Sequence, residues 1–235
     1  MQSAQQVVRA WAGAQLVERD GPVLLGLSGP QGAGKSTLTA ALAAAGELVV
    51  VGIDDVYRPR AERQRLAVEV SPLFAVRGPP GTHDLALLHE TLDGLLAGRP
   101  TPLPRFDKRT DDRCPTADWP LQERPARLIV VEGWCIGATL PPDFLDPAPL
   151  NAIEATDHDL RWRRGQAEAL AGPYAALWDR MDAFAIALRL PNHFRAIFGE
   201  GAFNAAYVPT YLRVLEQDGD ARAQKFASQI FTLLL

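Results

Sequence analysis

The distribution of apolar residues along the chain predicts strands that alternate with helices. Short apolar runs have the length and the continuous apolar character of strands that are buried on both faces, and they cover residues 23–27, 48–51, 128–131 and 183–190. Apolar positions at helical spacing predict helices over residues 3–19, 38–45, 85–96 and 168–181. This alternation is typical of an α/β fold with a mainly parallel central sheet flanked by helices.

The segments between these elements are polar or irregular. Residues 58–82 are charged and then rich in proline and glycine, and residues 77–84 read as a loop that enters a helix capped by Asp84 or Thr82. A polar loop is expected over residues 105–121 and an irregular one over 140–149. We expect one domain, with an N-terminal helix in residues 1–20, a core in 21–191 and a helical tail in 192–235.

A phosphate-binding loop follows the first predicted strand. Residues 29–36 fit the pattern G-x-x-x-x-G-K-[ST], between an apolar strand and a run of helix-forming residues. Glycines let backbone N–H groups converge on a phosphate, and the helix N-terminus adds partial positive charge. The alternative, a chance glycine-rich turn, does not explain the correct flanks. The expected phosphate ligands are Gly29, Gly32, Ala33, Gly34, Lys35, Ser36 and Thr37, with the Ser36 hydroxyl also on Mg²⁺.

Acidic residues follow the next two strands, where ligands of parallel sheets bind. Asp54 comes after the second strand, and we predict that it is the general base that orients an attacking hydroxyl. Asp55 either caps the next helix or binds metal through water, and simple capping of a turn remains the alternative for both residues. Glu132 ends the third strand and is predicted to hold Mg²⁺ or its water, unless it is a solvated strand-end acid.

A second set of polar residues suggests an anionic acceptor. Arg105, Lys108 and Arg113 lie close together in one loop, and such cations suit a carboxylate or a phosphate. A solvated loop held by its own ion pairs is the competing interpretation. His83 either contacts substrate or is an ordinary surface histidine. The aromatic residues Tyr57, Phe106 and Trp134 either wall the acceptor pocket or belong to the core.

Composition narrows the class of protein. The chain has 235 residues, a hydrophobic content of 47% and a net charge of −4, with both signs mixed. It has no basic block that would favour nucleic acid, and no run apolar enough for a signal peptide or a bilayer span. Two cysteines, Cys114 and Cys135, indicate neither a disulfide framework nor a zinc site. We therefore expect a cytoplasmic enzyme of small molecules, with no nucleic-acid or membrane partner.

Together these motifs resemble the P-loop D-glycerate 3-kinases, in the wider group of phosphoribulokinase, uridine kinase and pantothenate kinase. The resemblance rests on the phosphate loop and on Ile53–Tyr57, Arg77–Asp84, Pro104–Lys108, Asp111–Arg113 and Val131–Gly137, which come in the family's order. Residues 151–154 and 162–163 also look like the segment that follows the third strand. The resemblance spans roughly residues 20–197.

This resemblance implies a P-loop fold, ATP and Mg²⁺ as cofactors, and phosphorylation of the 3-hydroxyl of D-glycerate. By position, Asp54 resembles the base of the wider group, Lys35 and Ser36 the phosphate and metal residues, and Glu132 the strand-end acid. Other hydroxylated metabolites, such as a sugar, a nucleoside or pantothenate, remain alternative acceptors.

The tail departs from the family. There, the fourth strand precedes a tryptophan–arginine helix that acts as a lid over ATP, whereas residues 194–203 here lack that motif. The tail is either diverged or the product of an altered reading frame. Because lid arginines neutralise transition-state charge, an ATP-binding protein with impaired catalysis is a further alternative.

Overall fold

The computed structural model describes residues 20–30, 32–35, 39, 48–145, 148–149 and 151–186. All of them belong to one compact unit, Met1–Leu188. The helix predicted over residues 3–19, the helix predicted over 38–45 except for Thr39, and the tail over 192–235 lie outside the described residues.

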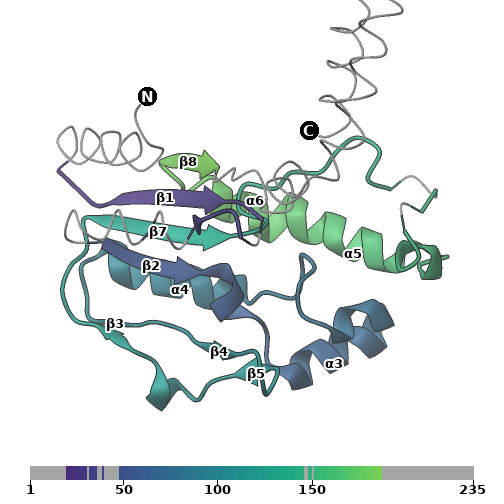
Figure 1. The fold of residues 1–235 in the computed structure, drawn as a ribbon, viewed down its shortest axis with the longest axis horizontal. Helices are drawn as coiled ribbons and strands as arrows, with labels where there is room; N and C mark the ends of the chain where they lie inside the picture. The colour runs from purple at the N-terminus through teal and green to yellow at the C-terminus, as the bar shows by residue number, and fades with distance from the viewer. Residues whose placement is uncertain are drawn as a thin grey trace, which may run out of the picture. The chain divides into compact units, whose positions relative to one another are not determined.

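The central sheet consists of four parallel strands. They are β1 (Val23–Ser28), β2 (Leu48–Gly52), β7 (Leu128–Gly133) and β8 (Ala183–Ile186). Their order is β2-β7-β1-β8, and Figure 1 shows the arrows pointing the same way. All four predicted strands are confirmed, although residues 187–190 of the last one lie outside the described part. The strand β7 therefore separates the two strands that precede the phosphate loop and Asp54.

Both faces of the sheet are apolar, as expected for parallel strands. One face packs against helices, and its buried side chains include Leu24, Val49, Val51, Ile129 and Val131. The other face carries Val23, Leu25, Leu27, Leu128 and Val130. The α/β class with a mainly parallel sheet and flanking helices is thus confirmed.

The helix predicted over residues 85–96 is confirmed as α4 (Leu85–Leu96). It covers the first face of the sheet, with Leu85, Leu88, Leu92 and Leu95 in the core. The Asp84 side chain caps it by accepting a hydrogen bond from the backbone N–H of Leu87 at 3.1 Å.

The prediction of one helix over residues 168–181 was wrong. The structure has α5 (Arg161–Ala169), a π-helical turn (Leu170–Tyr174) and α6 (Ala175–Trp178). The earlier start has a physical cause, because the Asp157 carboxylate accepts hydrogen bonds from the N–H groups of Trp162 and Arg163 at 2.9 and 3.0 Å. Pro173, which has no N–H to donate, lies in the π-helical turn.

Two segments for which no helix or strand was predicted contain regular structure. Residues 58–82 include the helix α3 (Arg60–Glu69) and the 3₁₀ turn η2 (Pro72–Ala75). The polar loop expected over residues 105–121 includes a hairpin of β4 (Phe106–Asp107) and β5 (Asp112–Arg113), and the strands β3 (Thr101–Pro102) and β6 (Leu121–Gln122) pair around it. The sequence did not predict α3 from apolar periodicity, because the buried residue of this helix is Arg63.

Further 3₁₀ turns are η1 (Ile53–Val56), η3 (Thr116–Asp118) and η4 (Glu154–Thr156).

The end of β7 leaves no room for a side chain at Gly133. A Cβ atom at this position would lie 2.4 Å from Cγ2 of Ile53, whose side chain is fully buried. We predict that Gly133→Ala lowers the free energy of unfolding by about 1–3 kcal/mol, because the core there must shift. Chemical denaturation measures this, with Gly21→Ala as the control, since no heavy atom lies within 4 Å of a Cβ at Gly21. Equal stability of the two variants would contradict the prediction.

Candidate functional site

The candidate site lies at the carboxyl edge of the sheet. In the strand register, Ser28 of β1 is opposite Gly133 of β7, and Gly52 of β2 is opposite Glu132. The three strands therefore end together, and the segments that follow them meet there. A cleft of about 650 Å³ at this edge is lined by Pro30, Gly32, Lys35, Gly52, Asp54, Asp55, Lys108, Glu132, Gly133 and Trp134.

The phosphate loop forms the wall of the cleft that follows β1. Its glycines Gly32 and Gly34 have φ of 77° and 88°, in the left-handed region that glycine tolerates best. The Lys35 ammonium donates hydrogen bonds to the carbonyl oxygens of Gly29 at 2.7 Å and Pro30 at 3.1 Å. Lys35 thus lies against its own loop, where an incoming phosphate can compete for it. Ser36 and Thr37 lie outside the described residues.

Asp54 lies in the turn η1 that follows β2 and is held by two donors. Its carboxylate accepts hydrogen bonds from Nζ of Lys108 at 2.7 Å and from the Tyr57 hydroxyl at 3.0 Å. Burial alone raises the pKa of Asp54, but the hydrogen bond and charge of Lys108 and the Tyr57 bond together hold it below its usual value. Asp54 is therefore ionised at neutral pH.

The pKa of the neighbouring carboxylate, Asp55, is shifted in the opposite direction from that of Asp54. Asp55 pairs with Nη1 of Arg105 at 2.9 Å and accepts a weak hydrogen bond from the N–H of Phe106 at 3.4 Å. Burial raises the pKa of Asp55 more than the Arg105 charge lowers it, and the charge of Asp54 adds to the increase. The two acids that follow β2 therefore differ in proton affinity, an arrangement that often separates a base from a supporting group.

Glu132 has features that suit a shared metal ion. Its Oε2 atom is buried without a hydrogen-bond partner among the described residues. Burial raises the pKa of Glu132, the Lys35 charge opposes this, and Asp55 and Asp54 add to it. Within the described ranges, no group of three or more His, Cys, Asp or Glu side chains could bind a metal. Mg²⁺ usually retains waters and takes one or two carboxylates together with substrate phosphates.

His83 is buried rather than on the surface. Its ring is 2% exposed, stacks on Tyr57 with centroids 4.4 Å apart, and pairs through Nδ1 with the Tyr174 hydroxyl. Burial lowers the pKa of His83 to about 4, against the charge of Asp54, so the ring is neutral at pH 7. Of the two alternatives for His83, an ordinary surface histidine is therefore wrong. His83 supports Tyr57 and thereby the Asp54 side of the cleft.

The other predicted acceptor residues divide into two groups. Arg105 and Lys108 form ion pairs with Asp55 and Asp54, respectively. Arg113 instead donates to the Tyr57 carbonyl at 2.9 Å and pairs with the Asp84 carboxylate at 2.9 Å. Its side chain is 16% exposed, and it is not among the residues that line the cleft.

The three predicted aromatic residues are divided between the protein interior and the cleft. Tyr57 and Phe106 are buried at 3% and 8% exposure, while Trp134 lines the cleft with 47% of its surface exposed.

The sequence pattern did not single out two residues that organise the site. Tyr174 contacts His83 from the π-helical turn, and Arg63 of α3 bonds the turn between β4 and β5. Neither belongs to a local motif, and their partners are 91 and 48 residues away in the chain. Only the fold brings these pairs together.

Comparison with known proteins relates most of the chain to kinases. It is 32% identical over 182 residues to the chloroplastic D-glycerate 3-kinase of Arabidopsis thaliana, across 70% of this chain and 37% of that protein. It is 35% identical over 130 residues to the uncharacterized kinase mug58 of Schizosaccharomyces pombe, across 49% of this chain and 47% of the relative. The chain thus spans less than half the length of these two relatives.

A solved structure supports the fold. The D-glycerate 3-kinase of Cryptococcus neoformans superimposes with a TM-score of 0.60 at 24% identity, over 79% of this chain and 73% of that one. At this identity the likeness concerns the fold, in which a parallel sheet carries the phosphate loop.

The C-terminal part is similar to a different family. Residues 179–235 match the family model of the lipid II flippase MurJ. The probable lipid II flippase of Rhizobium meliloti is 47% identical over 53 residues, across 23% of this chain and 10% of that protein. The tail is therefore similar to a family other than the kinases. The match begins directly after α6 and includes β8.

No helix in the described part of the chain is long and apolar enough to cross a bilayer.

The ion pair between Lys108 and Asp54 gives a prediction about pH. In Lys108→Gln, burial of Asp54 is no longer opposed by the Lys108 charge, so we expect the pKa of Asp54 to rise. Because the folded-state pKa is lowered in the parent protein, the stability contributed by this pair is present above the unfolded pKa. It is lost as the pH falls through the folded pKa.

Carboxyl NMR titration measures the shift, with Asp54→Asn used to assign the resonance. Arg109→Gln is the control, since this side chain is 92% exposed and pairs with Asp107. The same Asp54 titration in Lys108→Gln and the parent would refute the assignment of the ion pair.

Proposed function

The chain belongs to the P-loop kinase family of the D-glycerate 3-kinases, and we propose that it is an ATP-dependent kinase that phosphorylates the 3-hydroxyl of D-glycerate. The observation that carries this proposal is the cleft at the carboxyl edge, where a phosphate-loop lysine, an ionised aspartate and a half-buried glutamate face one space. Phosphoryl transfer needs positioning and charge neutralisation more than covalent chemistry, and these groups supply both.

In this proposal the phosphate loop holds ATP. Backbone N–H groups from Gly29 to Thr37 surround the phosphates, and Lys35 exchanges its two carbonyl contacts for phosphate oxygens. Ser36 and Glu132 are the residues that would hold Mg²⁺, which neutralises phosphate charge when bound. The Oε2 atom of Glu132, which has no hydrogen-bond partner among the described residues, supports this role.

Asp54 is the proposed base. It is ionised, and it lies in the same cleft as Lys35, so the acceptor hydroxyl can donate a hydrogen bond to it while facing the phosphates. A lowered pKa makes Asp54 a weak base as long as Lys108 is bound to it. An acceptor carboxylate that takes a share of Lys108 weakens this pair, which raises the basicity of Asp54 at the moment when the hydroxyl is in place.

The acceptor carboxylate is assigned to Lys108 and Arg105. Both side chains are about half exposed, and each is bonded to an acid of η1 that lines the cleft. Lys108 uses one of its three N–H donors on Asp54, which leaves donors for a second carboxylate. Tyr57, His83 and Arg113 frame this part of the site, since His83 stacks on Tyr57 and Arg113 bonds its carbonyl.

A screen of acceptors with labelled ATP tests the proposal. We expect phosphate transfer to D-glycerate above transfer to sugars, nucleosides and pantothenate. Transfer to one of these compounds and none to glycerate would identify another kinase of the same group instead.

One observation favours a second candidate function, an ATP-binding protein with impaired catalysis. Residues 179–235 match the flippase model where the kinases have their lid helix. Without lid arginines, the charge of the transition state is less well neutralised and water is less well excluded. ATP binding and glycerate-dependent ADP release, measured on the same sample, separate the two functions. Tight binding of ATP with no turnover would support the second.

Asp54→Asn distinguishes catalysis from binding. The amide cannot accept the hydroxyl proton, so we expect the kcat of glycerate phosphorylation to fall by roughly 100- to 10,000-fold. The Kd of ATP, measured by calorimetry, should change by less than about threefold, since no phosphate ligand is removed. A loss of ATP binding in parallel with activity would show that Asp54 serves the nucleotide instead. Asp118→Asn, an exposed position on η3, is the matched control.

A further inference from the structure

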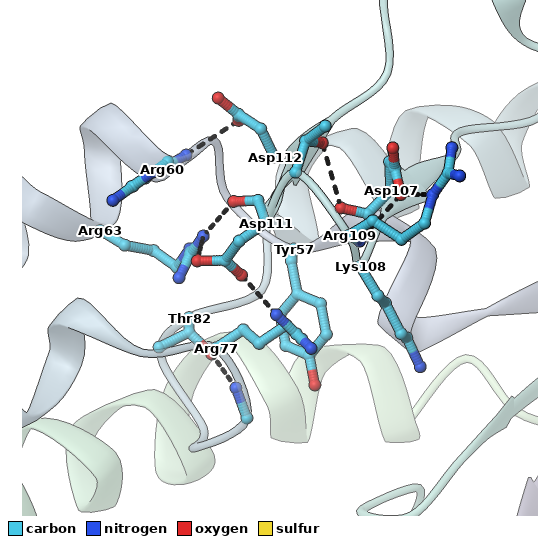
Figure 2. Close-up of polar contacts among 12 residues, drawn as sticks. Tyr57, Arg60, Arg63, Arg77, Thr82, Asp107, Lys108, Arg109, Asp111 and Asp112 are labelled. Atoms are coloured by element: carbon cyan, nitrogen blue, oxygen red, sulfur yellow. Dashed lines mark hydrogen bonds and ion pairs between the residues drawn. The ribbon is translucent and has the colours of Figure 1, made fainter.

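The turn between β4 and β5 is held at one residue by two arginines. Asp111 pairs with Arg63 at 2.9 Å through one carboxylate oxygen and with Arg77 at 2.5 Å through the other. Figure 2 shows both arginines converging on Asp111 from separate segments of the chain. Asp111 also has a φ of 56°, a left-handed conformation that non-glycine residues adopt at some cost. The contacts of its side chain offset this cost.

Arg63 connects the turn to the body of the protein. Its side chain is 0% exposed, and it donates to the carbonyls of Arg58 at 3.2 Å, Ala75 at 2.9 Å and Asp111 at 2.6 Å. Its guanidinium also lies 5.8 Å from the centre of the Phe106 ring in β4. A buried charge is stable only when its donors are satisfied, so these partners fix the hairpin against α3 and η2.

The same hairpin carries the two cations that pair with the acids Asp54 and Asp55 of the cleft. Lys108, three residues before Asp111, contacts Asp54, and Arg105 at the start of the hairpin contacts Asp55. Arg63, Arg77 and Asp111 are not among the residues that line the cleft. Their effect on the cleft is therefore exerted through the position of the hairpin.

We propose that Arg63, Asp111 and Arg77 are positioning residues, which hold the β4–β5 hairpin so that Lys108 and Arg105 place the carboxylate of a short hydroxy acid beside Asp54. Nζ of Lys108 lies 2.7 Å from Oδ2 of Asp54, so one acceptor can contact both only if few atoms separate its carboxylate and its hydroxyl. A hairpin fixed at Asp111 cannot retreat to admit a longer acceptor. This inference rests on the proposed function and adds the residues that restrict the length of the acceptor.

Asp111→Asn tests whether these ion pairs hold the hairpin in place, because the amide keeps the shape of the side chain and removes its charge. We expect the KM for D-glycerate to rise about tenfold, since small displacements of a positioning group are costly, while the Kd of ATP stays unchanged. The kcat at saturating glycerate should fall less than threefold. Asp118→Asn, with the same change of charge at an exposed position, should match the parent protein.

A second measurement does not depend on activity. The chain has three lysines, Lys35, Lys108 and Lys225, so peptide mass spectrometry can follow each one after brief treatment with an amine-acylating reagent. Releasing the turn loosens the ion pair of Lys108, and we expect its acylation relative to Lys225 to rise roughly two- to fivefold in Asp111→Asn. Arg77→Gln, a change at a partly exposed side chain, should act in the same direction and serves if Asp111→Asn does not fold.

The outcomes separate the two proposals. Faster acylation of Lys108 without phosphate transfer to glycerate by the parent protein supports the positioning role and rejects glycerate as the acceptor. Transfer to glycerate combined with parent-like acylation and KM in both Asp111→Asn and Arg77→Gln overturns the positioning role and leaves the kinase proposal intact.

Discussion

The site depends on the position of β7 between β1 and β2 in a parallel sheet. This register ends the three strands at one level, so that the phosphate loop, the acids of η1 and Glu132 share one cleft. A shift of β7 by one residue would turn Glu132 to the other face of the sheet. The fully buried residues Ile129, Val130 and Val131 resist such a shift, because each fits one of the two apolar faces. The packing of the core thus fixes the geometry of the charges at its edge.

Within the cleft, burial and pairing decide which carboxylate is ionised. Burial acts against the charged form of Asp54, Asp55 and Glu132 alike, but only Asp54 has enough donors to keep its pKa below the usual value. Lys108 supplies most of this compensation, and it comes from a hairpin that is held from outside the cleft. The protonation state of the proposed base is therefore set by the position of the hairpin as much as by the local sequence around Asp54.

The sequence predicted the parts of this structure that short patterns encode. The buried strands, the capped helix α4 and the glycine-rich loop each carry a local signal of apolar runs, a capping side chain or fixed spacing. The helix α3 and the hairpin of β4 and β5 lack such a signal, since α3 buries an arginine and the two strands have two residues each. Arg113 illustrates the same limit for the site. Its charge suggested a ligand contact, but the fold brings Asp84 and the Tyr57 carbonyl to it, and no spacing in the chain reveals those partners.

The strand β8, which lies at the edge of the sheet in the described part of the chain, shows how a segment similar to another family can join this sheet. Few contacts of this strand require a particular side chain. The strand starts where the Asp182 carboxylate accepts a hydrogen bond from the N–H of Leu24 at 2.8 Å, and then Ala183 and Ala185 pack on the apolar face opposite α4. Between them, Phe184 lies against Gly26, whose missing side chain leaves room for its ring, and remains 47% exposed. An acid followed by alternating small and large apolar residues satisfies these contacts, and edge strands need partners on one side only. The carboxyl edge, where the proposed site lies, demands far more, because Lys35, Asp54 and Glu132 must each occupy one position relative to the others. A match to the flippase family after α6 is therefore compatible with a kinase-like sheet, and its consequences fall on the groups that should close over the nucleotide.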